Sequence, residues 1–113
     1  MTASLAAKTC IPCKGGVPPL TSPQARELLA QAAGWQLAGD DTRIEKAFGF
    51  ANFKDSLDFA GQVGDLAESE FHHPVSITFG WGFCAIVLQT KKIRGLHEND
   101  FIMAAKINAL AGA

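Results

Sequence analysis

The sequence predicts an α+β fold: a four-stranded antiparallel sheet with three helices on one face, in the order α-β-β-α-β-β-α. Two observations lead to this prediction. Three segments place apolar residues at the three- and four-residue steps of a helix, and each interval between them holds two short strand-like runs joined by a tight turn. Strands joined by tight turns run antiparallel, so we expect two hairpins whose sheet is covered by the helices.

The first helix marks the start of the folded domain. Residues 1–20 contain a Gly-Gly pair and a Pro-Pro pair, so they are expected to form a flexible arm or a strap laid on the domain. Residues 21–113 then form one domain. Ser22 is the expected N-cap, Pro23 takes the first helical position, and Gly34 closes the helix.

A hairpin and the second helix come next. A short strand at residues 35–37, a Gly-Asp-Asp turn and a second strand over residues 44–50 form the hairpin. Asn52 is the expected cap of a helix over about residues 53–70. Its apolar face repeats at helical spacing and consists of Phe53, Leu57, Ala60, Val63, Gly64 and Ala67.

The second hairpin and the last helix complete the chain. Residues 75–79 alternate as a strand does, and a Gly-Trp-Gly turn leads to residues 83–88. That second strand is almost wholly apolar and is expected to be covered on both faces. A polar loop over residues 90–95 precedes a helix that starts near Glu98, where acidic residues suit the helix dipole.

Composition narrows the class of protein. The chain has 113 residues, 48% hydrophobic and 19% charged, which is typical of one ordered globular domain. A net charge of -1 gives no general attraction to nucleic acids or anionic membranes. No apolar run reaches the roughly 18–20 residues of a membrane span, and the N-terminus does not read as a signal peptide. We therefore expect a cytoplasmic protein that binds neither nucleic acid nor membrane directly.

The cysteines leave one question open. Cys10, Cys13 and Cys84 are an odd number, which argues against a disulfide framework. Cys10 and Cys13 form a CxxC, but no second ligand pair stands at zinc spacing and no βαβ pattern surrounds it. An N-terminal arm that binds metal only adventitiously or weakly is favoured over a real zinc or redox site, and no metal site is expected in the folded domain.

The richest candidate site is Glu68-Ser-Glu-Phe-His72-His73-Pro74 at the end of the second helix. His72 lies at the helix C-terminus, where the dipole favours an imidazolium, and Glu68 lies four residues back on the same face. Both effects predict that His72 holds a proton readily. Pro74 disfavours helix at His73, so the pair is expected to leave the helix into one cleft.

Other interpretations of these residues remain. A histidine pair at a helix end often only caps the surface. A zinc site with His97 is disfavoured, because adjacent ligands are awkward for one ion and no HxxxH or HxH spacing occurs. The cluster of Lys91, Lys92 and Arg94 is either a solvated strand end or a site for an anionic or electron-rich heterocycle.

The spacing of these residues resembles the signature of the pterin-4a-carbinolamine dehydratases. The resemblance covers roughly residues 22–110 and includes the closing segment 95–106. It rests on Glu68, three residues, then His72-His73-Pro74, six residues to Trp81, nine to Lys91 and eight to Asp100. That family dehydrates 4a-hydroxytetrahydropterin to quinonoid dihydropterin, which recycles the cofactor of aromatic amino acid hydroxylases. It requires no metal or organic cofactor.

The resemblance also implies the roles of individual residues. His72, His73 and Pro74 line the pterin site together with Glu68, and the segment Thr90, Lys91, Lys92 and Ile93 forms another wall. Asp100 holds the loop from behind. Members are commonly dimers or tetramers, so a homodimer or homotetramer with a small-molecule pterin substrate is expected.

The chain departs from the family pattern at Lys91, where a third histidine is usual. Dehydration needs an acid and a base that exchange protons near the working pH, and His72 and His73 are expected to share these roles. Lys91 either orients the pterin electrostatically or, if desolvated, joins the proton transfer. The alternative function is a non-enzymatic dimerisation, regulatory or assembly partner of another protein, as some relatives are.

Overall fold

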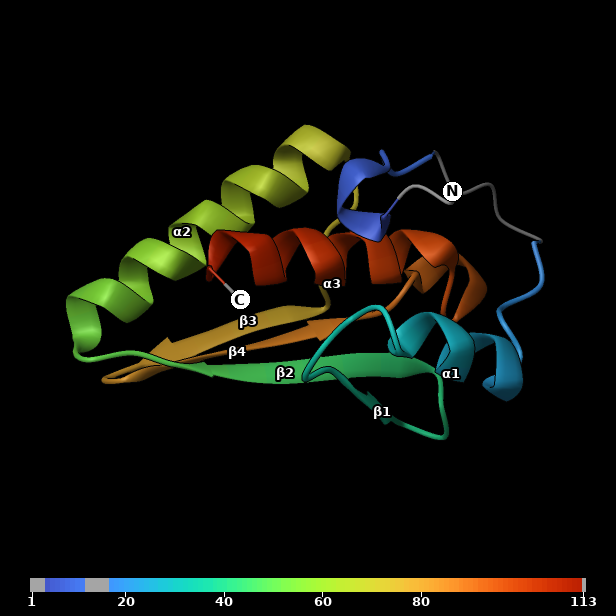
Figure 1. Ribbon diagram of the computed structural model, residues 1–113, viewed down its shortest axis with the longest axis horizontal. Helices are drawn as coiled ribbons and strands as arrows, with labels where there is room; N and C mark the ends of the chain where they lie inside the picture. Colours follow the sequence, from blue (N-terminus) through green and yellow to red (C-terminus); the bar gives the residue numbers. More distant parts are fainter. Residues whose placement is uncertain (1–3, 12–16, 113) are drawn as a thin grey trace.

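The computed structural model describes residues 4–11 and 17–112 (Figure 1). Its four-stranded antiparallel sheet has the order β1-β2-β4-β3. The strands are β1 (Gln36–Ala38), β2 (Arg43–Gly49), β3 (Ser76–Gly80) and β4 (Phe83–Leu88). The helices are α1 (Ser22–Leu29), α2 (Phe53–Glu70) and α3 (Glu98–Leu110), with short 3₁₀ turns η1 (Leu5–Ala7) and η2 (Lys91–Ile93). The predicted fold class and element order are confirmed.

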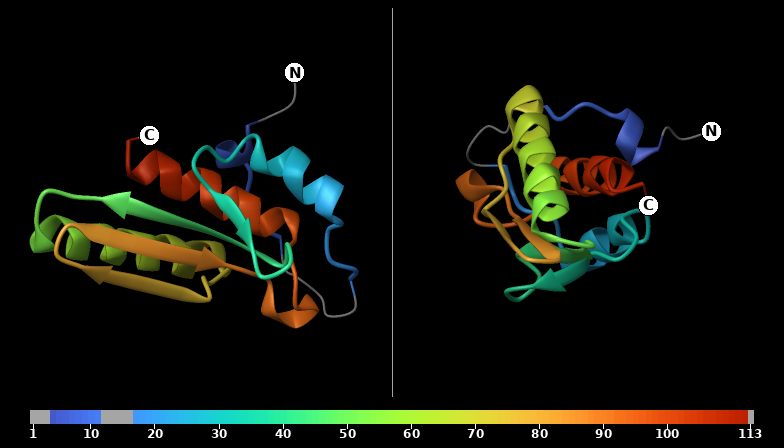
Figure 2. Two further views of the ribbon diagram at one scale, coloured as in Figure 1. Left: turned by 90° about the horizontal axis from the view of Figure 1, so that it is seen from below. Right: turned by 90° about the vertical axis from the view of Figure 1, so that its left-hand side faces the viewer.

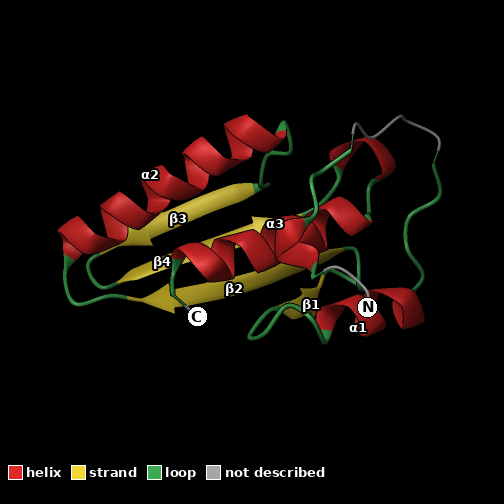
Figure 3. Cartoon of the chain, turned by 45° about the horizontal axis from the view of Figure 1, so that its top comes forward, coloured by secondary structure: helices red, strands yellow, loops and turns green. Residues whose placement is uncertain are grey.

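The core lies between the sheet and the helices. α2 packs on β3 and β4, and α3 lies between α2 and α1 (Figure 3). The central strands β2 and β4 pair in a register that sets Phe48 opposite Cys84 and Ile44 opposite Leu88. Alternate residues of a strand share a face, so these four side chains all point toward the helices and are buried.

The opposite face of the sheet corrects one prediction. Cys84, Ile86 and Leu88 of β4 are fully buried on the helix side, but Phe83 is 41% exposed and Val87 is half-buried. Within residues 4–11 and 17–112, no helix lies over this second face (Figure 2). The prediction that β4 is covered on both faces is therefore wrong for the single chain, because an antiparallel sheet can leave one face uncovered.

The first helix is shorter than predicted. Its N-cap is Thr21 and not Ser22, since Thr21 and Gln24 form a reciprocal capping box. The helix ends at Leu29, five residues before Gly34. Gly34 instead sits at φ +83° in the turn that follows, a conformation that glycine adopts without strain.

The second helix has the predicted bounds, and its end positions the candidate site. Asn52 accepts a hydrogen bond from the Asp55 amide at 2.8 Å, so it is the predicted cap. Phe53 and Leu57, expected on the apolar face, are 44% and 40% exposed and lie outside the core. The helix closes in a Schellman motif, with left-handed Phe71 as the residue after its end.

Residues 4–11 lie on the domain surface beside α2 and α3, and we call them the strap. Leu5 of η1 is 3% exposed and belongs to the core. Lys106 of α3 donates to the carbonyl oxygen of Ala6 at 2.9 Å. None of the helices in the described part of the chain combines the length and apolar character needed to cross a bilayer.

Candidate active site

A cavity of about 420 Å³ opens where the end of α2 meets the loop after β4. Its eight lining residues include five of the predicted site residues. The lining consists of Ile11, Phe71, His72, His73, Gln89, Thr90, Lys91 and Lys92. Glu68, Pro74, Ile93 and Asp100 were also predicted for the site, and they stand behind or beside this lining.

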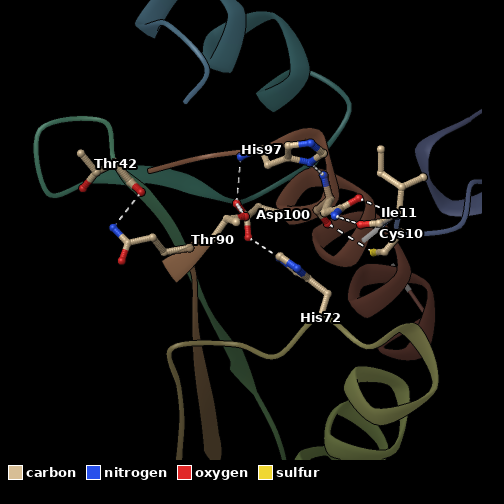
Figure 4. A network of polar contacts seen from close by, with 9 residues as sticks. Cys10, Ile11, Thr42, His72, Thr90, His97 and Asp100 are labelled. Atoms are coloured by element: carbon tan, nitrogen blue, oxygen red, sulfur yellow. Dashed lines mark hydrogen bonds and ion pairs between the residues drawn. The ribbon is translucent and has the colours of Figure 1, made fainter. Parts of the chain in front are cut away.

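Asp100 is the polar centre beneath the cavity. Its side chain is fully buried, and its Oδ1 lies 2.7 Å from Nε2 of His72 (Figure 4). Its Oδ2 accepts from the Thr90 hydroxyl at 2.8 Å and from the His97 amide at 3.0 Å. The last bond belongs to a capping box at the start of α3, so the helix end fixes the carboxylate that holds His72.

The bond to Asp100 selects a form of the His72 ring. An ionised carboxylate only accepts hydrogen bonds, so Nε2 of His72 carries a proton in this contact. In the neutral imidazole, Nδ1 is then the atom left to accept a proton. His72 is 9% exposed, so this arrangement sits in a largely dry environment.

His73 has a different environment from its neighbour. Its side chain is 59% exposed, and its Nε2 contacts the carboxylate of exposed Glu68. Glu68 therefore contacts His73, and the prediction that Glu68 shares a helix face with His72 is wrong. The reason is Phe71: its left-handed backbone, at φ +54°, ends the helical repeat before the i+4 position is reached.

The segment that carries the pair is anchored at both ends. The His72 amide donates to the Ala67 carbonyl of α2 at 3.2 Å. On the other side, the Val75 amide donates to Val87 of β4 at 2.8 Å, just before β3 begins. The pair leaves the helix into one cavity, as predicted, and Pro74 lies half-buried in the connection.

The lysine wall comes from a closed loop after β4. Thr90 and Gly95 form an isolated antiparallel bridge, and the Thr90 amide donates to Gly95 at 2.9 Å. Lys91 and Lys92 start the turn η2 inside this loop and are exposed at the cavity, whereas Ile93 is half-buried and does not line it. Lys91 is therefore exposed in this structure, and its part in the reaction stays a prediction.

Sequence reasoning missed three residues of the lining. Ile11 comes from the strap, where no periodic pattern guided a prediction. Phe71 was treated only as the end of the helix, although its place directly before the histidines was a usable signal. Gln89 directly precedes Thr90, and its side-chain Nε2 donates to the Thr42 carbonyl oxygen at 3.1 Å.

The zinc site that was considered for His72, His73 and His97 is not formed by the described residues. His97 is the N-cap of α3, and its Nδ1 accepts from the Asn99 amide at 3.0 Å. In the part of the chain that the structure describes, no three His, Cys, Asp or Glu side chains are grouped to hold a metal. Burial, and then the neighbouring Glu70 carboxylate, raise the pKa of the Cys10 thiol to about 12, so it stays protonated. Cys13 lies outside the described residues.

The chain resembles known proteins over nearly its whole length. The family model described as Pterin 4 alpha carbinolamine dehydratase matches residues 18–110. A protein of Methylococcus capsulatus named "Putative pterin-4-alpha-carbinolamine dehydratase" is 54% identical over 108 residues, which is 96% of this chain and 94% of that protein.

Two solved structures share the fold. The crystal structure of a transcriptional coactivator/pterin dehydratase from Brucella melitensis is 32% identical with a TM-score of 0.77, covering 83% of this chain and 99% of that one. A pterin dehydratase-like protein identified as a RuBisCO assembly factor in the alpha-carboxysome is 28% identical with a TM-score of 0.62, covering 71% and 92%.

Proposed function

The chain belongs to the pterin 4 alpha carbinolamine dehydratase family, and from this premise we propose that it is a hydro-lyase acting on 4a-hydroxytetrahydropterin. The products are quinonoid dihydropterin and water. The proposed pathway is tetrahydropterin recycling for aromatic amino acid hydroxylation. A cytoplasmic location stays a prediction of the sequence.

The observation that carries the proposal is the histidine pair in one cavity. His72 and His73 both line a space of about 420 Å³, within the usual range for small-ligand pockets. One ring is fixed by a buried carboxylate, whereas the other is open to solvent. Two imidazoles in unlike surroundings suit a reaction that needs one proton donor and one proton acceptor.

The chemistry follows from the bonds that change. The hydroxyl on C4a receives a proton and leaves as water, while N5 loses its proton and its electron pair forms the C4a–N5 double bond. One histidine gives a proton and the other takes one, so the total number of protons on the enzyme is unchanged, and exchange with water returns each ring to its starting form. His72 and His73 share these roles, and the ammonium of Lys91 supports the polar edge of the pterin. Pairs of this kind contribute roughly 10²–10⁴ in rate.

A direct assay of carbinolamine decay tests the proposal. His72→Ala and His73→Ala should each lower kcat/KM, by about 100-fold for a lost acid or base. His97→Asn is the matched control, because this third histidine lies outside the cavity lining and asparagine is a good N-cap. If both alanine variants keep wild-type kcat/KM, the histidine pair is not catalytic.

A second candidate function is that of a partner for another protein. One relative of known structure is a RuBisCO assembly factor, and this chain exposes large apolar side chains at the tip of its second hairpin. Trp81 is 74% exposed, and the rings of Phe53 and Phe79 pack 6.0 Å apart at the surface. The same apolar surface supports the proposed homodimer or homotetramer.

Two measurements separate these functions. Calorimetric binding of a pterin supports the enzyme, whereas no pterin binding together with a stable complex in a pull-down supports the partner. Light scattering of the purified protein gives the oligomeric state. A monomer at micromolar concentration would contradict the proposed homo-oligomer.

A further inference from the structure

Two exposed apolar side chains stand at an otherwise polar cavity. Of the eight lining residues, only Ile11 and Phe71 are apolar, and they are 61% and 88% exposed. They come from segments 60 residues apart in the sequence, the strap and the turn after α2. Neither side chain belongs to the core, and among the exposed large apolar side chains these two are the ones that line this cavity.

Phe71 occupies a backbone position that disfavours it. Its φ of +54° lies in the left-handed region, where a bulky side chain is strained and glycine or asparagine is at ease. The Schellman motif that Phe71 forms would be as well or better served by those residues. The turn therefore gives no reason for a phenylalanine at this position.

Ile11 is held in place by its backbone, which leaves its side chain free. Asn99 clamps it from both sides: the Ile11 amide donates to Asn99 Oδ1 at 3.0 Å, and Asn99 Nδ2 donates to the Ile11 carbonyl at 2.6 Å (Figure 4). The neighbouring Cys10 amide donates to Glu70 at 2.8 Å. Asn99 directly precedes Asp100, so one turn of α3 positions both Ile11 and the polar centre.

We propose that Ile11 and Phe71 bind the flat faces of the pterin ring, while the histidines and lysines meet its polar edge. A planar heterocycle has apolar faces and a hydrogen-bonding rim, which is the division seen in this lining. The inference rests on the proposed function. It adds a substrate-binding role to the strap, which precedes the family match at residues 18–110.

The test measures dissociation constants by calorimetry, with two probes. One is 7,8-dihydrobiopterin, and the other is 7,8-dihydropterin, which has the ring without the side chain. Ile11→Ser and Phe71→Asn should each raise Kd by about fivefold for both probes, the scale of one lost aromatic or apolar contact. KM should rise by more than kcat falls. Val17→Ser and Leu110→Asn, which change exposed apolar residues outside the lining, should leave Kd unchanged.

Stability separates a binding role from a structural one. Phe71→Asn should raise Tm, because asparagine tolerates the left-handed conformation, even as affinity falls. If the wild type binds both probes and the two variants bind equally well, the inference is overturned and the proposed function stands. If the wild type binds neither probe, the proposed function is overturned and the inference falls with it. If the two variants bind 7,8-dihydrobiopterin more weakly but bind 7,8-dihydropterin as the wild type does, the proposed contact with the pterin ring is wrong.

Discussion

Two neighbouring halves of the same cavity are built in opposite ways. The floor consists of His72, Thr90 and Asp100, which are all buried and joined by bonds of 2.7 and 2.8 Å. The rim consists of His73, Glu68 and Lys91, which are all exposed. Hydrogen bonds are stronger and more restrictive in a dry environment, whereas solvent screens an exposed ion pair.

Adjacent, identical residues thus have unlike surroundings, which is what the proposed division into proton donor and acceptor requires. His72 is locked in orientation by a carboxylate that has no freedom of its own, so it can hold a proton at a defined place. His73 is open to solvent and is oriented only by its contact with the exposed Glu68 carboxylate. The change of environment takes place within one peptide bond, since His72 meets buried Asp100 of α3 and His73 meets exposed Glu68 of α2.

Asp100→Ala should break the floor and have the largest effect. It removes the acceptor of three donors, on His72, Thr90 and His97, and leaves those of His72 and Thr90 buried. Loss of about 3 kcal/mol in the free energy of unfolding is expected, with kcat/KM near that of His72→Ala. Urea denaturation and the carbinolamine assay measure the two effects.

Asp100→Asn is the matched control for shape. It keeps an acceptor for Thr90 and His97, so the stability loss should be smaller than in the alanine variant, while kcat/KM still falls because the charge facing His72 is gone. Equal stability of Asp100→Ala and wild type would show that this buried network does not hold the floor together.

Thr90→Val should weaken the floor by one bond. The side chain keeps its shape and loses the hydroxyl that donates to Asp100 at 2.8 Å, and the His97 amide still satisfies that oxygen. We expect a loss of about 1–2 kcal/mol in unfolding free energy and a smaller fall in kcat/KM than for Asp100→Ala. Thr78→Val, on the exposed side of β3, controls for the substitution and should not destabilise.

The sequence predicted the periodic parts of the molecule well. The apolar repeat of α2 gave its bounds of residues 53–70, because a buried stripe recurs at fixed steps. The histidine pair and the Thr90 loop were also predicted to meet, through the family spacing. These features depend on local pattern or on residue types at fixed separations, both of which one sequence displays.

What the sequence could not give was the direction of side chains. The prediction that Glu68 and His72 share a helix face assumed that the helical repeat continues to His72. It does not continue, because the backbone of Phe71 is left-handed. The Ile11 backbone amide bonds to the side chain of Asn99, which lies 88 positions further along the chain. No pattern of residue types in the sequence predicts such a bond. The open face of the sheet was missed for a related reason, since an apolar run does not say what covers it.

Glu68→Gln changes a residue of the exposed rim and should leave the buried floor unchanged. Both partners of the His73 contact are exposed, so unfolding free energy should change by no more than about 0.5 kcal/mol. A severalfold fall in kcat/KM is expected, because His73 loses the carboxylate that orients it. In about 1 M salt exposed charges are screened, so the difference in kcat/KM between the wild type and Glu68→Gln should become smaller. If Glu68→Gln lowers the unfolding free energy as much as Thr90→Val does, Glu68 contributes to stability as the floor residues do, and the distinction between floor and rim is wrong.

Cys10→Ser should have no effect on kcat/KM. It should change the pH dependence of the unfolding free energy, and only at alkaline pH. Cys10 lies on the buried side of the strap beside Glu70, so its surroundings resemble the floor more than the rim. Burial and the Glu70 carboxylate raise its pKa from 9.0 to about 12. Between these values the unfolded thiol loses its proton while the folded thiol keeps it, so the wild type loses stability as pH rises.

Serine does not ionise in this window, and Cys13 and Cys84 are present in both proteins. The unfolding free energy of the wild type minus that of Cys10→Ser should therefore be constant at about pH 8 and below, and fall steadily as pH rises through 9.0 toward about 10.5. Urea denaturation at half-unit pH intervals measures this difference. Parallel curves would mean that Cys10 ionises as freely in the folded protein as in the unfolded chain, and that the strap does not shield it.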